Sequence, residues 1–426
     1  MKETVKHQKV VLLGSWLGWS LDGYDLVLML FVIPSISQLF FPSENSTLSL
    51  VATFSVYIIA LIVRPLGGAF FGNFGDKKGR KKTMMITIWG FALATFATGL
   101  LPTWEMVGIL APIFLILLRF AQDFFAGGEW GSGAVITMES VEKQKRGIYS
   151  GFLQSGFASG FLLASIAFQI ITILFVGDAF VDYGWRILFF TGLIPGFVAF
   201  IVRYKMHESY VWLHRKHSKT PRIPIKEIFT KKQRKPFFLS LIILTGLMYA
   251  YYASIGFIPT FFQEYQGLER SETGLIMIGA TAAVLGGTIF TGFISQKIGR
   301  RKILTILSVV AIIISVPVTM ALVNATNTLD RIAYSVILVF ATATGFGVIP
   351  AFLSERFPTR IRNTASGTVF NAGLIIGAWA PVIGINLLSV GDFIPYFFAA
   401  NIIIGSIMIL VGARLNPETR NADLAE

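Results

Sequence analysis

The stretch Val10–Ile33, VVLLGSWLGWSLDGYDLVLMLFVI, decides the fold of this chain. Its residues are almost all apolar, and a helix of this length spans the ~30 Å hydrocarbon core of a bilayer at about 1.5 Å per residue. The run is longer than the apolar core of a signal peptide and no small-x-small cleavage site follows it. We therefore expect a retained membrane-spanning helix at the start of the chain.

Comparable apolar runs recur along all 426 residues, of which 54% are hydrophobic and only 14% charged. Soluble domains carry roughly 25% charged residues, so a soluble enzyme or a nucleic-acid binder is excluded. The runs are continuous rather than alternating, which excludes a β-barrel and predicts an all-α membrane protein. Twelve spans are predicted, at residues 10–34, 48–72, 83–101, 107–138, 147–175, 186–205, 237–262, 273–294, 303–323, 331–354, 363–388 and 395–413.

The basic residues give the predicted orientation. Nearly all of the 36 Lys and Arg residues fall on alternate connections, together with both termini. Arg186, Arg270 and Arg331 lie on the opposite side, while Arg64 and Arg119 lie within spans. Because basic loops stay in the cytoplasm, we expect a multi-pass protein of the cell membrane with both termini cytoplasmic.

The chain divides into two six-helix halves, residues 1–205 and 237–426, joined by a basic connection at residues 206–236. The halves carry a repeat, since GNFGDKKGRKK at Gly72–Lys82 recurs as GFISQKIGRRK at Gly292–Lys302. Pseudo-symmetric halves around a central cavity are typical of alternating-access transporters. The connection is expected to lie on the anionic inner leaflet, a regulatory docking site being the alternative.

Several motifs carry a family resemblance. Gly72-x-x-x-Asp76-x-x-Gly79-Arg80-Lys81 resembles the loop signature of the major facilitator superfamily, and Pro417-Glu-Thr resembles its tail motif. The segments Asp22-Gly-Tyr-Asp25, Arg64-Pro-Leu-Gly-Gly68, Arg119-x-x-Gln122 and Gly127-Gly-Glu-Trp-Gly131 resemble those of the metabolite–proton symporters. The branch most similar in these motifs takes sialate, aromatic acids and short carboxylates, although Asp123 stands where that branch usually has glycine.

Ionisable residues inside the spans are the first candidates for function, because each costs roughly 2.5–3.5 kcal/mol at the bilayer centre. All of them lie in the first half. They are Asp22, Asp25, Arg64, Arg119, Asp123 and Glu129.

Asp22 and Asp25 share one helix face near mid-membrane, at a spacing of i,i+3. Two carboxylates held close in a dry cavity do not both stay ionised, so we expect one or both to carry the coupled proton. The alternative is that Asp22 bonds a neighbouring helix and only Asp25 titrates. Glu129 is expected to relay protons inward or, equally, to make a structural bond to a neighbouring backbone group.

Arg119 offers a planar fork that matches a carboxylate. It either captures an anionic substrate or is neutralised by Asp123, one turn on, together with an aspartate of the first span. The two states could also alternate, which would couple substrate to proton. Arg64 is expected to snorkel to the inner surface, in a structural or gating role.

Two further groups complete the predicted site. We expect polar walls of the cavity at Gln154, Tyr249, Tyr252 and Asn371, beside the substrate-binding Arg119 and Asp123. The resemblance implies a cytoplasmic latch that locks the outward-open state. Its residues are Asp76, Arg80, Glu139, Arg146, Glu355 and Arg362.

The sequence holds no ATP-binding P-loop, so transport is expected to run on an ion gradient. Buried Asp and Arg together favour proton-coupled uptake of a small organic acid, a monocarboxylate. A zwitterion or sugar carrier, a drug or metabolite exporter, sodium coupling and a non-transporting sensor are the alternatives. We expect no enzymatic activity, no cofactor or metal, no nucleic-acid partner and a monomer in the lipid bilayer.

Overall fold

The computed structural model describes residues 2–78, 80–204, 227–358, 361–380, 394–420 and 422–424. Over these residues the chain folds into helices and turns, with no strand among them. The predicted all-α class is therefore confirmed. Most of the predicted connection at 206–236 lies outside the described residues.

The helices fall into an N-terminal and a C-terminal group. The first contains α1 (Lys2–Phe40), α2 (Ser46–Leu61), α3 (Arg64–Lys78), α4 (Arg80–Gly99), α5 (Trp104–Val107), α6 (Leu110–Ala126), α7 (Glu129–Ser140), α8 (Arg146–Leu174), α9 (Trp185–Thr191) and α10 (Leu193–Tyr204). The second contains α13 (Arg234–Ala253), α14 (Ile258–Thr260), α15 (Arg270–Ile298), α16 (Arg300–Val323), α17 (Thr328–Ala343), α18 (Ile349–Arg356), α19 (Arg362–Gly377) and α21 (Ile394–Leu415).

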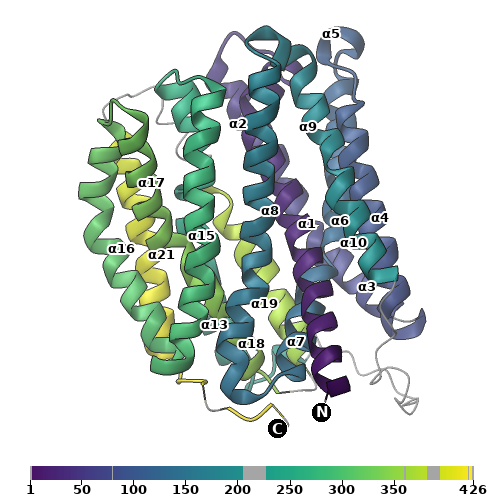
Figure 1. The fold of residues 1–426 in the computed structure, drawn as a ribbon, viewed down its shortest axis with the longest axis vertical. Coiled ribbons are helices and arrows are strands. Elements are labelled where there is room, and N and C mark those ends of the chain that lie inside the picture. The colour runs from purple at the N-terminus through teal and green to yellow at the C-terminus, as the bar shows by residue number, and fades with distance from the viewer. Residues whose placement is uncertain are drawn as a thin grey trace.

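The two groups meet chiefly along α8 and α15, which pack side by side over their length (Figure 1). On the N-terminal side α1 packs along α8, and on the C-terminal side α13 packs against α19 and α21. Both chain termini lie at the same end of the bundle (Figure 1).

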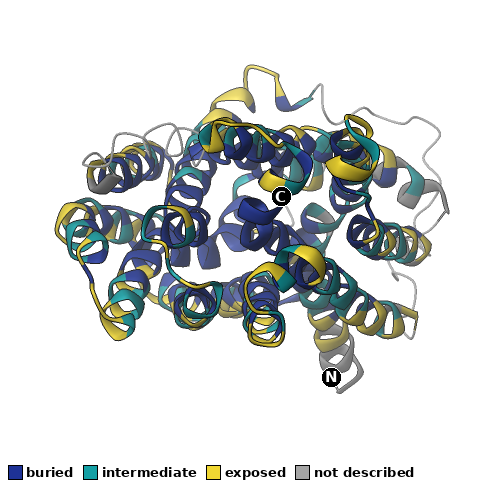
Figure 2. Ribbon diagram, turned by 90° about the horizontal axis from the view of Figure 1, so that it is seen from above, coloured by how far each residue is buried: buried dark blue, intermediate teal, exposed yellow. Residues whose placement is uncertain are grey.

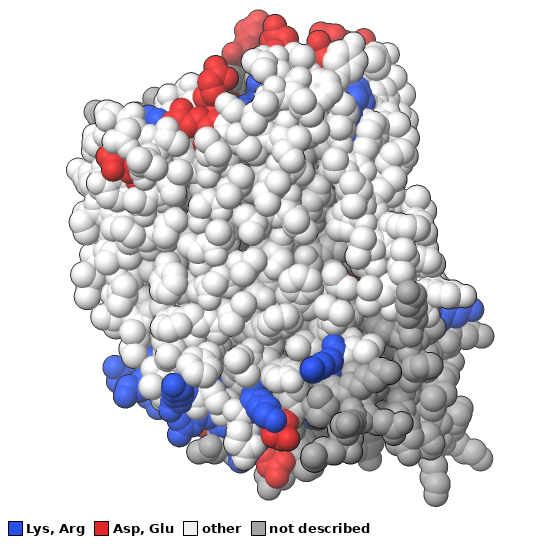
Figure 3. Space-filling model, viewed as in Figure 1, with Lys and Arg blue, Asp and Glu red and all other residues white. Residues whose placement is uncertain are grey.

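The outer surface of the bundle is apolar. Viewed from above, buried residues fill the centre and exposed ones lie on the perimeter (Figure 2). Large apolar side chains such as Leu174, Phe197 and Ile313 are 67%, 55% and 67% exposed, which a water-facing surface would not tolerate in such number. Figure 3 shows an uncharged band between an end with acidic groups and an end where Lys and Arg gather. A bilayer is the solvent that this surface fits.

Ten helical segments of the described chain are long and apolar enough to cross a membrane. The two predicted spans that do not appear among them are residues 83–101 and 363–388. The first corresponds to α4, which begins with the basic run Arg80–Lys82. The second begins as α19, which ends at Gly377, and residues 381–393 lie outside the description.

Several of the predicted spans are divided into shorter helices, which the sequence did not predict, and two of these divisions lie close to Arg64 and Asp123. The span 48–72 divides at Ile62 and Val63, just before Pro65. Proline lacks the N–H that would continue the helical hydrogen bonds, so it fits the first turn of a new helix. The span 107–138 divides at Gly127 and Gly128, between α6 and α7.

Candidate functional site

Arg64, at the start of α3, holds two carboxylates inside the N-terminal half. Its Nη1 and Nη2 donate to the two carboxylate oxygens of Asp22 at 3.0 and 2.9 Å, and its Nε donates to Asp123 Oδ1 at 2.6 Å. All three residues are buried. The predicted snorkelling of Arg64 to the inner surface is wrong, because two buried aspartates hold its guanidinium inside the bundle.

The helix breaks bring these three groups together. A Cβ atom on Gly67 would lie 1.9 Å from the backbone oxygen of Phe124, and one on Gly127 would lie 1.9 Å from that of Arg64. Only glycine permits this close approach of α3 to the α6–α7 break. Asp123 therefore reaches Arg64 on the neighbouring helix, and the prediction that it pairs with Arg119 on its own helix is wrong.

Asp25 forms a second buried cluster. Gln122 Nε2 donates to Asp25 Oδ1 at 2.6 Å, and the Thr95 hydroxyl donates to the same oxygen. Arg119 Nη1 lies 3.7 Å from Asp25 Oδ2 and donates instead to Gln122 Oε1 at 2.6 Å. Asp25 is thus held mainly by neutral donors, with the guanidinium alongside rather than in a bidentate bond.

Arg119 points into the protein and not into lipid. It is 2% exposed, its guanidinium lies 5.6 Å from the centre of the Tyr57 ring, and its Nε has no hydrogen-bond partner. One predicted alternative paired Arg119 with an aspartate of the first span, and Asp25 of that span does lie beside its guanidinium. The Nε–H of Arg119 is therefore not bonded within the described structure, as expected for a group that exchanges partners.

The two clusters together hold an excess of acid. Asp22, Asp25 and Asp123 offer three carboxylates to two guanidiniums, Arg64 and Arg119. An uncompensated buried charge is costly, so a proton on one carboxylate balances the set. The arrangement can therefore take up and release a proton between buried groups.

Glu129 lies beside these clusters at the start of α7, where the Thr87 hydroxyl on α4 donates to its Oε1. Its side chain is only half-buried, unlike the three aspartates. This bond is to a side-chain hydroxyl and not to the backbone group that was predicted, and the relay of protons stays a prediction.

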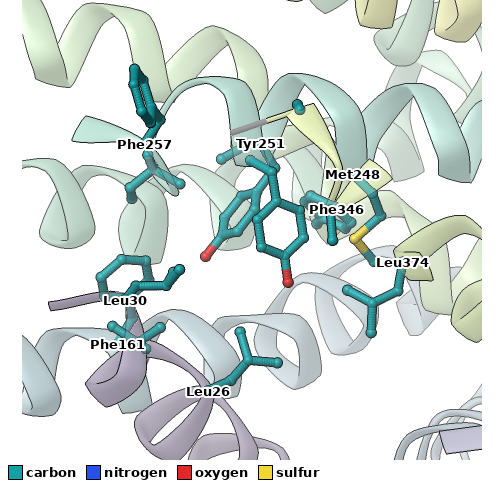
Figure 4. Packing of buried hydrophobic residues seen from close by; sticks show 14 of the residues in the cluster. Leu26, Leu30, Phe161, Met248, Tyr251, Phe257, Phe346 and Leu374 are labelled. Carbon is teal, nitrogen blue, oxygen red and sulfur yellow. The ribbon is translucent and has the colours of Figure 1, made fainter. Parts of the chain in front are cut away.

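A central pocket adjoins the Arg64 cluster and is lined by side chains from both halves. Gln154, Tyr252 and Arg64 line it, so two of the predicted wall residues lie at the pocket, and their contact with substrate stays a prediction. Figure 4 shows how apolar and aromatic side chains of the two halves meet here, with Leu26 facing Met248, Phe346 and Leu374. Its walls are mostly apolar, with few polar groups.

Two predicted wall residues lie elsewhere. Tyr249 turns its hydroxyl to Asn401 Oδ1 on α21, at 2.5 Å, and Asn371 donates to the Gly367 carbonyl of its own helix at 3.0 Å. Neither belongs to the lining of the pocket. Sequence reasoning missed Trp19 and Tyr251, which line it, because aromatic residues in spans are mostly packing residues.

Ion pairs join the two halves at the end where the termini lie. Arg362 Nη1 donates to Glu139 at 2.7 Å, and Arg146 lies 4.0 Å from Glu355. Glu355 is also bonded by Arg300 at 3.1 Å, a partner that the sequence analysis did not name. The side chains of two predicted latch residues, Asp76 and Arg80, lie outside the described part of the structure.

The last described residues cross this same end. The Ala422 carbonyl accepts from Arg146 of the N-terminal half, and the Leu424 carbonyl accepts from Arg362 of the C-terminal half. Glu418 accepts from the backbone N–H groups of Arg300 and Arg301 at the start of α16. The tail therefore adds backbone contacts to the ion pairs that close this end.

The chain is similar in sequence to known membrane transporters. The model of the Major Facilitator Superfamily matches residues 14–381. A putative metabolite transport protein of Haemophilus influenzae is 31% identical over 435 residues, covering 98% of this chain and 97% of that protein. The proline/betaine transporter of Escherichia coli K12 is 29% identical over 394 residues, covering 89% of this chain and 77% of that protein.

Among solved structures, the fold is similar to the partially occluded, inward-open conformation of the xylose transporter XylE from E. coli. The TM-score is 0.75 at 19% identity, with 98% of this chain and 100% of that chain covered. At this identity the likeness concerns the fold. It confirms the predicted layout of twelve transmembrane helices in two six-helix halves.

Proposed function

We propose that this chain, which belongs to the Major Facilitator Superfamily, is a proton-coupled symporter that takes up a small organic anion, a monocarboxylate, by alternating access. The observation that carries the proposal is the buried excess of carboxylates over guanidiniums beside a pocket shared by both halves. A proton bound to one of these carboxylates neutralises the excess negative charge, and release of the proton restores that charge. Rocking of residues 1–205 against 237–426 then moves both cargoes across.

Asp25 is the proposed proton carrier. Asp22 has a bidentate ion pair with Arg64, which favours the ionised carboxylate in any state that keeps this bond. Asp25 has no direct hydrogen bond from a guanidinium and lies 3.7 Å from Arg119. A proton on Asp25 therefore breaks fewer charge-assisted bonds than a proton on Asp22. Arg119 is not among the residues that line the pocket, so its binding of the substrate stays a prediction.

A compact zwitterion is the second candidate substrate. The proline/betaine transporter of E. coli is among the relatives, and the pocket carries the aromatic rings of Trp19, Phe157, Tyr251 and Phe370. Aromatic faces attract ammonium groups. A sugar fits less well, because its many hydroxyls need more polar partners than these walls offer.

We propose the cell membrane as the location, with the Lys- and Arg-rich end in the cytoplasm. Basic connections are retained on that side during insertion. Both termini lie at this end (Figure 1), so both are proposed to be cytoplasmic. The ion pairs between the halves then close the cytoplasmic side of the transporter.

Proteoliposomes with an acidic exterior test the proposal. We expect uptake of at least one of benzoate, lactate, proline and glycine betaine, with proton entry that depends on the solute. Each pH unit supplies about 1.4 kcal/mol per proton, enough for about tenfold accumulation. Full uptake under a sodium gradient alone, or uptake without proton entry, would refute the coupling.

Neutralising the latch is expected to slow turnover and spare binding. In Glu139→Gln the bond to Arg362 loses its charge, while the pocket is untouched. Because half-exposed ion pairs contribute up to about 1 kcal/mol, we expect the maximal rate to fall about threefold with KM nearly unchanged. Transport kinetics in proteoliposomes measure both.

The matched control for this variant is Glu142→Gln, which breaks an exposed ion pair with Lys145 within one half. Its rate should equal that of the wild type. A raised KM in Glu139→Gln, or equal rates in both variants, would show that the Glu139–Arg362 pair is not a latch.

A further inference from the structure

Two polar groups in the central pocket lack hydrogen-bond partners. Among the residues that the structure describes, neither the indole Nε1 of Trp19 nor the hydroxyl of Tyr251 has a hydrogen-bond partner, and each residue is only 5% exposed. Leaving a buried donor unpaired is costly, and most such groups in folded proteins are paired. Two of them in one pocket call for a ligand that the pocket is built to receive.

Both groups border the same space. Trp19 and Tyr251 line the pocket, and the Phe157 ring contacts each of them, with ring centres 5.0 Å from Trp19 and 6.2 Å from Tyr251. Trp19 belongs to α1 in the N-terminal half, and Tyr251 belongs to α13 in the C-terminal half. A molecule that bonds both would connect the two halves.

The charged residue of this lining already has its partners. Arg64 donates through Nε, Nη1 and Nη2 to Asp123 and Asp22. An incoming anion would have to compete with two carboxylates for that guanidinium. The neutral donors of Trp19 and Tyr251 are therefore the ones that remain available to a bound molecule.

An unpaired indole is not by itself a site. Trp185 is also fully buried with an unpartnered Nε1, but it does not line the pocket and packs against Phe40 and Phe189. What distinguishes Trp19 is that it lines the pocket together with Tyr251, a residue of the opposite half whose hydroxyl also lacks a partner among the described residues.

We propose that the Trp19 N–H and the Tyr251 O–H hold the carboxylate oxygens of the transported solute, one donor from each half. This inference rests on the proposed function. An indole N–H can only donate, so it selects an acceptor oxygen and rejects an ammonium or alkyl group at that position. The surrounding rings of Phe157 and Phe370 then contact the remainder of the solute. A solute bonded in this way bridges the two halves. Binding of the solute therefore links the N-terminal half to the C-terminal half, which must move relative to each other during transport.

Trp19→Phe and Tyr251→Phe test the proposal, since each keeps an aromatic ring and removes the donor. The probe is whichever of benzoate, lactate, proline and glycine betaine the wild type takes up fastest. We expect KM to rise about tenfold in each variant, with the maximal rate within about twofold. The melting temperature of the empty Tyr251→Phe protein should not fall, because the hydroxyl that it loses has no partner.

Trp185→Phe is the matched control, and its KM should stay at the wild-type value. Unchanged KM in Trp19→Phe and Tyr251→Phe, with intact wild-type uptake, would overturn this inference alone. A rise in KM that is as large in Trp185→Phe would do the same. Failure of the wild type to take up any of the four probes would overturn the proposed function together with this inference.

Discussion

Replacing Asp25 by asparagine is expected to abolish proton-driven accumulation and to leave substrate exchange intact. An asparagine oxygen can still accept from Gln122 and Thr95, so the local structure survives. It cannot take up or release a proton, so it fixes the protein in the neutral state of Asp25. In proteoliposomes the pH step should then give no accumulation above equilibrium, while labelled substrate still exchanges with unlabelled.

The companion variants Asp22→Asn and Glu129→Gln locate the carrier among the predicted acids. If Asp25 carries the proton, Asp22→Asn leaves the carrier in place but removes the excess of carboxylates, so accumulation should fall strongly while some dependence on the pH step remains. Glu129→Gln should slow uptake without removing its dependence on the pH step. Accumulation by Asp25→Asn equal to the wild type would disprove the assignment, and loss of exchange as well would make Asp25 a binding or folding residue.

The membrane fold was predictable because the bilayer imposes it on the sequence. A helix must stay apolar across the hydrocarbon core, and basic residues such as Lys77 and Lys302 mark one side. The breaks were not predicted, because the composition stays apolar across Ile62 and Val63. Pro65 and the Gly127–Gly128 pair were the signals that could have revealed them.

The depth of Arg64 was mispredicted for a related reason. Counting turns along one helix places a residue relative to the surface, but it does not tell which helices are its neighbours. Its partners Asp22 and Asp123 come from α1 and α6. Asp123 provides the second carboxylate that holds Arg64. The sequence had singled out this position only because the family resemblance led us to expect a glycine there.

The walls of the pocket were only partly predictable. Tyr249, Tyr251 and Tyr252 follow closely on α13, and successive helical residues point about 100° apart. Which of them faces the pocket depends on how α13 is rotated. An apolar pattern around the whole helix does not fix this rotation, so Tyr249 was chosen and Tyr251 was missed.

Arg64→Met is expected to be the most destabilising of the substitutions considered. It removes the cation that holds Asp22 and Asp123 and leaves two buried carboxylates without a partner. Breaking a buried ion pair from one side costs about 3–5 kcal/mol. We expect a large fall in melting temperature, a low yield of folded protein in the membrane and loss of transport.

Restoring the charge balance should restore the fold. Asp123→Asn alone leaves Arg64 with Asp22 in a bidentate pair, so its stability should stay close to that of the wild type. The triple variant Arg64→Met, Asp22→Asn, Asp123→Asn removes all three charges and should recover most of the melting temperature lost in Arg64→Met. It should not recover transport, because the excess of carboxylates on which coupling depends is then gone.

Arg64→Lys separates charge from geometry. A lysine ammonium supplies the positive charge but cannot place three donors in the plane of a guanidinium, so we expect stability between that of Arg64→Met and that of the wild type. If Arg64→Met were as stable as the wild type, the two aspartates would not depend on this cation. The buried charges would then be balanced elsewhere, and the coupling argument that rests on their number would fail with it.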